Sequence, residues 1–249
     1  MAKALDFGVQ SYCFREFKDN ADVARKVREI GLDKIELCRI HADFHDLESW
    51  KKVLATYKNE GVEVISLGVE AFHGLENERD LFECAALGGF SHISGTFRVD
   101  TYTKAIPWVR KLSQEYGVKV GIHNHGGYDF AGNTEVLKHL IGLGTPEIGL
   151  CIDTAWAMQI GPRPGNPVAW AKEFAGHITG VHYKDFLFDK HGQWEDTIVG
   201  QGTLQLKDFV AALEAGGFDG MAVIEYEADP ENPVPALKAC VDAMRSMTA

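Results

Sequence analysis

Four side chains that could bind a metal ion each follow a short apolar segment. His123 follows VKVGI, Asp153 ends IGLCID, His182 ends ITGVH and Glu225 ends MAVIE. Parallel strands with side chains at their carboxyl ends place those side chains at one edge of a sheet or barrel. Two imidazoles and two carboxylates suit one divalent ion, and the nitrogen ligands favour Mn, Fe, Co or Zn over Mg. The pattern predicts a metal site built from these four residues.

Each residue also has a structural interpretation when it is taken alone. A single histidine in a strand is commonly a hydrogen-bonded core residue, and Asp153 could cap the helix that follows it. The four at matching strand ends favour the metal site. His125 shares the face of His123, so we expect it to contact substrate or to support a ligand. The glycine pair Gly200 and Gly202 fits either a turn or a phosphate-binding loop.

Short β-rich segments alternate with longer helical segments along the whole chain, which predicts a parallel sheet. We expect strands within 5–13, 32–38, 62–67, 91–95, 118–126, 147–153, 177–182 and 221–225. We expect helices at 19–30, 50–58, 76–87, 102–116, 133–141, 168–174, 206–215 and 235–247, with Asn133 as an N-cap. Eight units in 249 residues favour one closed (β/α)8 TIM barrel, a single domain over residues 1–249. An open doubly wound sheet is the alternative, and the lack of a GxGxxG after the first strand weakens it.

The composition excludes several other classes of protein. The formal net charge of −11 is unfavourable for binding a nucleic acid backbone. The five cysteines form no C-x-x-C pair, so reduced, buried thiols are expected. No apolar stretch of 18 residues occurs, and the first residues contain no apolar signal core. We therefore expect a soluble cytoplasmic protein without a membrane or nucleic acid partner.

An ordered set of motifs resembles the xylose isomerase-like TIM-barrel superfamily of sugar phosphate isomerases and epimerases. The segments that carry the resemblance are GVQSYCFREF, GIHNHGG, GLCIDTAW, HYKD, GQGTLQLKDFVAAL and VIEYE. They span the whole chain in the family's order. Relatives in this superfamily include ketose 3-epimerases, hydroxypyruvate isomerases, inosose dehydratases and 3-keto-glycoside lyases.

The resemblance implies a ligand set and marks one departure from it. The epimerases bind their metal through Glu, Asp, His and Glu, and the last three match Asp153, His182 and Glu225. The first position is His123 here, so one of the two glutamates that serve as acid and base is missing. Endonuclease IV shares the barrel but needs additional histidines, and Trp156 stands where one would be expected. The family also implies a homo-oligomer.

The expected chemistry is proton abstraction next to the carbonyl of a sugar or keto-sugar through a metal-stabilised enediolate. We predict Glu225 as ligand and base, Glu36 as a second acid or base on the opposite wall, and Lys184 as a group that holds a substrate oxygen. The residues predicted to bind substrate are His125, Trp156, Tyr12 and Phe130.

Three outcomes remain open at this point. Return of the proton to the opposite face of the same carbon gives an epimer, and return to the neighbouring carbon gives an isomer. An isomerase or epimerase is the interpretation we favour. Loss of a leaving group gives a lyase or dehydratase acting on an inosose or a 3-keto-glycoside. A sugar-binding barrel without catalysis is a remote alternative, and the retained set of ligands argues against it.

Overall fold

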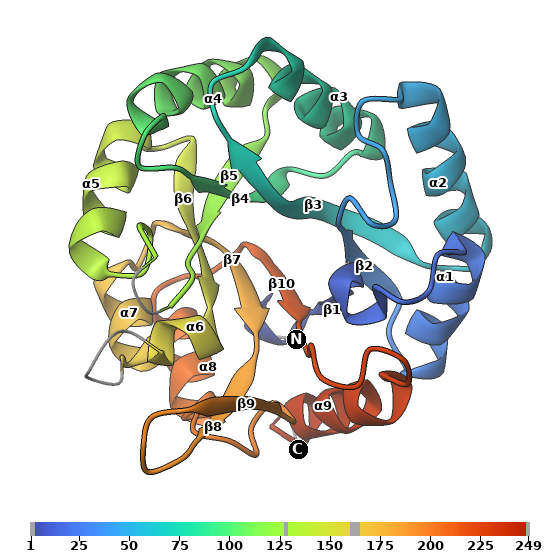
Figure 1. Ribbon diagram of the computed structural model, residues 1–249, viewed down its shortest axis with the longest axis vertical. Coiled ribbons are helices and arrows are strands. Elements are labelled where there is room, and N and C mark those ends of the chain that lie inside the picture. The colour runs from blue at the N-terminus through green and yellow to red at the C-terminus, as the bar shows by residue number, and fades with distance from the viewer. Residues whose placement is uncertain (1–2, 127–128, 160–164, 248–249) are drawn as a thin grey trace.

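Eight parallel strands form a closed barrel in the computed structural model, which describes residues 3–126, 129–159 and 165–247. Figure 1 shows the strands at the centre and the helices around them. The first strand closes the barrel by pairing with the last, with Gly8 opposite Val223. The strands are β1 Gly8–Gln10, β2 Lys34–Leu37, β3 Glu63–Phe72, β4 His92–Phe97, β5 Lys119–His123, β6 Ile148–Asp153, β7 Ile178–Tyr183 and β10 Met221–Ile224. The predicted TIM barrel is therefore confirmed.

Strands β6 and β10 are buried along their whole length because both of their faces are covered. All six residues of β6 are buried, and so are all four of β10. A parallel barrel packs one face of each strand into its centre and the other against helices, so it lacks the alternating pattern of a half-exposed sheet.

The outer layer consists of helices that connect successive strands. In the described residues these are α1 Asn20–Glu29, α2 Leu47–Asn59, α3 Arg79–Gly88, α4 Tyr102–Tyr116, α5 Thr134–Gly144, α6 Thr154–Met158, α7 Pro167–Glu173, α8 Leu206–Ala215 and α9 Val234–Ser246. Short 3-10 turns lie at Lys3–Leu5, Ser11–Phe14 and Glu76–Glu78. Several helices begin at a side-chain cap, and the predicted cap Asn133 accepts a hydrogen bond from the Val136 amide at 3.0 Å.

Several elements differ from the sequence-based expectation: β3 continues to Phe72, beyond the expected end at residue 67, and the short helix α6 was not predicted. The first strand is only β1, because 3-10 turns occupy both ends of the segment expected as one long strand. After β7 the chain forms an antiparallel hairpin of β8 Asp185–Phe188 and β9 Trp194–Thr197, which was not predicted. The hairpin lies outside the barrel beside α8 and α9 (Figure 1).

The cysteines agree with the expectation from composition. All five cysteines are free thiols in buried positions. None of the described helices combines the length and the apolarity that crossing a membrane requires.

Candidate metal centre

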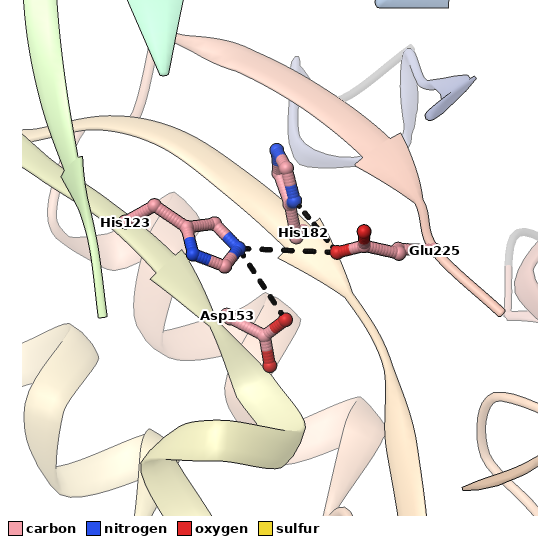
Figure 2. A group of neighbouring side chains, drawn as sticks. All are labelled: His123, Asp153, His182 and Glu225. Carbon is pink, nitrogen blue, oxygen red and sulfur yellow. Dashed lines mark hydrogen bonds and ion pairs between the residues drawn. The ribbon is translucent and has the colours of Figure 1, made fainter. Parts of the chain in front are cut away.

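The four predicted ligands meet at the carboxyl end of the barrel. His123 is the last residue of β5, Asp153 is the last of β6, and Asp153 pairs in register with His182 of β7. Glu225 follows β10 directly, and its amide still donates to the Tyr183 carbonyl at 3.0 Å. Neighbouring strands of the barrel thus deliver all four side chains to one point (Figure 2).

The distances between the ligand atoms suit a single ion. His123 Nε2 lies 3.5 Å from Asp153 Oδ2 and 3.8 Å from Glu225 Oε2, and His182 Nδ1 lies 2.9 Å from Glu225 Oε2. One candidate ligand atom from each residue lies within 4.8 Å of the other three. Atoms bound at about 2.1 Å to one ion are about 3.0 to 4.2 Å apart, depending on the angle between them.

Three buried atoms of this group make no hydrogen bond, which is the observation that best fits a bound cation. They are Nδ1 and Nε2 of His123 and Oδ2 of Asp153. Buried polar atoms are almost always paired, because leaving one unpaired costs about 1 to 3 kcal/mol. A divalent ion would give Nε2 and Oδ2 a partner. The residues present therefore fit a metal.

The pKa values of His123 and Glu225 are both shifted toward the form that carries the charge, so the group favours bound positive charge. Burial alone would lower the pKa of His123, but Asp153 and Glu225 outweigh it and raise this pKa. Burial alone would raise the pKa of Glu225, but Lys184, His182 and His123 hold it well below its usual range. Protons and a divalent cation compete for the same atoms in such a site.

Asp153 combines the two roles considered for it from the sequence. Its Oδ1 accepts a hydrogen bond from the Trp156 amide at 2.8 Å and so caps α6. Its Oδ2 remains available to a cation. The side chain of Asn124 fixes the backbone of Asp153, donating to its carbonyl at 3.1 Å and accepting from its amide at 3.0 Å. Asn124 had no role in the sequence-based site.

A cavity of about 400 Å³ lies beside His123 and Glu225 of this group and reaches the surface. This volume lies in the usual range for small-molecule sites. Of the residues predicted to bind substrate, Tyr12, His125 and Trp156 line it, together with His123 and Glu225. Glu227, which sequence reasoning missed, lines it as well. The signal for Glu227 was its spacing from Glu225, since residues two apart share a face of an extended strand.

Three predicted site residues do not line this cavity. Phe130 packs against Tyr102 of α4, with ring centroids 5.5 Å apart, and does not line the cavity. Lys184 does not line the cavity either. Its ammonium group pairs with Glu227 and lies 5.3 Å from the ring centroid of Trp156. Glu36 is fully buried and is not part of a cavity wall opposite Glu225.

The glycine pair after the hairpin is a loop folded on a carboxylate. The amides of Gly200, Gly202 and Leu204 all donate to Asp185, at 2.9 to 3.0 Å. A Cβ at Gly202 would lie 2.5 Å from Asp185 Oδ1, so glycine is needed for this approach. These amides are already used, which favours the turn over the phosphate-binding loop.

A larger hollow of about 630 Å³ lies at the opposite end of the barrel. Its lining includes the first residues of several strands, such as Lys34, Glu63 and Lys119. Active sites in this fold form at the carboxyl ends of the strands, and the amino end serves stability. The smaller cavity beside His123 and Glu225 is therefore the better candidate for an active site.

Known proteins resemble this chain in sequence and in fold. An inosose dehydratase from Lactiplantibacillus plantarum is 24% identical over 150 residues, covering 55% of this chain and 49% of the dehydratase. The chain thus matches about half the length of that relative. A xylose isomerase-like protein from Mycobacterium smegmatis, solved with magnesium, superposes with a TM-score of 0.76 at 14% identity, covering 97% of this chain and 94% of that one. The 3-keto-D-glucoside 4-epimerase YcjR from E. coli superposes with a TM-score of 0.72 at 17% identity, covering 97% and 99%.

The family assignment rests on the sequence and agrees with the barrel. The family model described as xylose isomerase-like TIM barrel matches residues 84–247, which is more than half of the chain. This chain belongs to the xylose isomerase-like TIM-barrel family.

Proposed function

We propose that this protein is a metal-dependent sugar isomerase or epimerase that removes a proton next to a carbonyl group. The observation that carries the proposal is a pair of buried atoms without a hydrogen-bond partner, His123 Nε2 and Asp153 Oδ2, which lie 3.5 Å apart beside a cavity that Glu225 also lines. His123, Asp153, His182 and Glu225 would hold the ion. A divalent ion there supplies Lewis acidity to a carbonyl oxygen and stabilises negative charge that develops on it.

Glu225 is the proposed base. One of its oxygens, Oε2, points at the two histidines, and the side chain still borders the cavity (Figure 2). Its lowered pKa keeps the carboxylate ionised at neutral pH. It can therefore take a proton from the carbon next to the carbonyl, which produces an enediolate.

A second proton-handling group must come from the other residues of the cavity. Burial and the neighbouring His123 lower the pKa of His125, so this imidazole is neutral at neutral pH and can accept or donate. Glu227 is the other candidate, with its carboxylate held by Lys184. Glu36 is fully buried and does not line the cavity, so it is not a candidate for this role.

The charges around the cavity support an uncharged sugar as substrate. Among the described lining residues the one cation is Arg39, and its Nε already pairs with Glu70 at 2.6 Å. Glu225 and Glu227 are acidic. A phosphate group would meet these carboxylates without an unpaired cation to bind it. Tyr12 and Trp156 offer apolar ring faces to a sugar.

A dehydratase is the second candidate, and the matched inosose dehydratase favours it. Both reactions begin with the same proton transfer and differ in the step after it. Elimination expels a leaving group from the β-carbon, whereas isomerisation returns the proton. A homo-oligomer and a single domain over residues 1–249 remain predictions.

The test is solvent exchange on a panel of ketoses, inososes and 3-keto-glycosides, with phosphorylated ketoses included. The protein is loaded with Mn²⁺ or Co²⁺ in D₂O, and substrates are recovered for mass spectrometry. Deuterium incorporation without an ultraviolet-absorbing enone supports the isomerase, and enone formation supports the dehydratase. Glu225→Gln should lower either rate by about 10²- to 10⁴-fold. Metal-loaded wild type with no exchange and no product across the panel would refute the proposal.

A further inference from the structure

Glu36 of β2 is a fully buried carboxylate in contact with one of the proposed metal ligands. Its Oε1 lies 2.8 Å from His182 Nε2 and accepts a hydrogen bond from Gln10 Nε2 at 2.5 Å. Its Oε2 accepts from the hydroxyl of Ser94 at 2.8 Å. Gln10 is itself anchored, because its amide also donates to the Gly68 carbonyl at 3.0 Å. Both carboxylate oxygens are therefore in use.

The two nitrogens of His182 face different groups. Nε2 faces Glu36 and also lies 3.5 Å from the Ser94 hydroxyl, and Nδ1 faces Glu225 at 2.9 Å on the side of the metal cluster. A neutral imidazole carries one N–H and one lone pair. Each nitrogen lies within hydrogen-bond distance of a carboxylate, so a cation bound on the Glu225 side would take the place of a proton on Nδ1, and Glu36 would keep the remaining proton on Nε2.

We propose that Glu36 is a positioning residue that orients His182 and fixes its proton on Nε2, so that Nδ1 binds the metal ion. This inference rests on the metal site of the proposed function and replaces the acid/base role expected for Glu36. A carboxylate that accepts the second N–H of a ligand histidine raises the basicity of that ligand and holds its ring plane. Gln10 and Ser94 in turn hold the carboxylate, so the support extends to β1 and β4.

The burial of Glu36 is consistent with this role and not with direct contact to substrate. Its exposed fraction is 0% and it does not line the cavity. A charged group in such a position needs several partners to offset its loss of hydration. Gln10, Ser94 and His182 supply them.

The experiment measures metal affinity, so it needs no knowledge of the substrate. Mn²⁺ and Co²⁺ are titrated calorimetrically into metal-free wild type, Glu36→Gln and Glu36→Ala, and the visible spectrum of the Co²⁺ forms is recorded. We expect Glu36→Ala to bind the ion about 10- to 100-fold more weakly, the usual loss when such a supporting group is removed. Glu36→Gln keeps an acceptor for Nε2–H but loses the charge, so its loss should be smaller.

Glu78→Gln is the matched control. Glu78 is also buried, but its carboxylate accepts from the amides of His73 and Gly74, away from the ligands. This variant should lose stability without losing metal affinity. If the Glu36 variants do not fold, Ser94→Ala replaces them, since it removes one of the bonds that hold Glu36. Weaker metal binding by Ser94→Ala then supports the role, and unchanged binding overturns it.

A second measurement locates the ring proton of His182. In ¹⁵N-labelled, Zn²⁺-loaded protein, ¹H–¹⁵N correlations of the histidine rings should place a proton on His182 Nε2 and the metal on Nδ1. A proton on Nδ1 would overturn the inference, and so would Glu36→Ala with wild-type affinity. Wild type that binds no divalent ion contradicts instead the metal site itself, so the two failures are distinguishable.

Discussion

Replacing Asn124 with alanine should weaken the fold and the metal site together. This side chain is completely buried and joins the end of β5 to the end of β6 through both backbone groups of Asp153. The substitution removes two hydrogen bonds and leaves a buried N–H and a buried C=O without partners. A single lost bond of this kind costs about 0.5 to 1.5 kcal/mol, and an orphaned buried group about 1 to 3 kcal/mol.

These terms overlap, so the expected loss in the free energy of unfolding is about 2 to 4 kcal/mol. The backbone of Asp153 would also relax, and Oδ2 would no longer be fixed toward His123 Nε2, now 3.5 Å away. Metal affinity should therefore fall as well. Urea unfolding of the metal-free protein measures the first effect, and calorimetric titration with Mn²⁺ measures the second.

Asn124→Asp provides the contrast. An aspartate can still accept from the Asp153 amide, but it places an oxygen against the Asp153 carbonyl in place of the donor. At low pH, where the aspartate is protonated, we expect the free energy of unfolding of Asn124→Asp to lie between those of wild type and Asn124→Ala. At neutral pH we expect Asn124→Asp to lose more of this free energy than it does at low pH. If Asn124→Ala unfolds within about 0.5 kcal/mol of wild type, the level of an ordinary surface substitution, the bridge does not stabilise this end of the barrel.

Two further predictions concern charge in and around the site. Burial raises the pKa of Asp196 from 3.8 to about 6, although Lys184 lies 3.9 Å away. The protonated side chain therefore favours the folded state below pH 3.8, and this contribution to the free energy of unfolding is lost as the pH rises through 6. Asp196→Asn should then raise the free energy of unfolding at pH 8 by at most about 3 kcal/mol and have little effect below pH 4, measured by urea unfolding at both values; an equal effect at both would contradict this. His123→Glu replaces a nitrogen ligand with oxygen and should shift the ratio of Mg²⁺ to Zn²⁺ affinity about tenfold toward Mg²⁺. An unchanged ratio in competition titrations would mean that His123 is not a ligand.

The barrel and the convergence of four side chains could be predicted from the sequence because both depend on strand ends. Apolar runs and alternating helices fix the order of elements, and the fold then brings His123, Asp153, His182 and Glu225 to one edge. The sequence could not reveal how deep a side chain lies within the barrel. Glu36 also ends a strand region, but it sits beneath His182 and not beside the cavity.

The hairpin after β7 was missed for a different reason. Its second strand, Trp194–Thr197, is mostly polar and carries no alternating apolar signal. It is held by contacts with other parts of the chain, such as Trp194 against Trp156 of α6 with ring centroids 4.9 Å apart. Lys184 reaches Glu227 beside this hairpin, a pairing between segments 43 residues apart. Local patterns contain no information on such contacts.

The histidine at position 123 bears on the outcome of the reaction as well as on the metal. If it binds the ion through Nε2, it cannot also exchange a proton with substrate through that atom. Epimerisation needs a proton-handling group on each face of the reacting carbon, whereas elimination needs one base and an acid near the leaving group. With Glu225 on one side, the described cavity offers His125 and Glu227 for the other role. The pKa of His125 is lowered by burial and by His123, so at neutral pH this imidazole is uncharged and can both donate and accept a proton. We therefore propose His125 as the partner of Glu225 in either reaction, an epimerisation or an elimination.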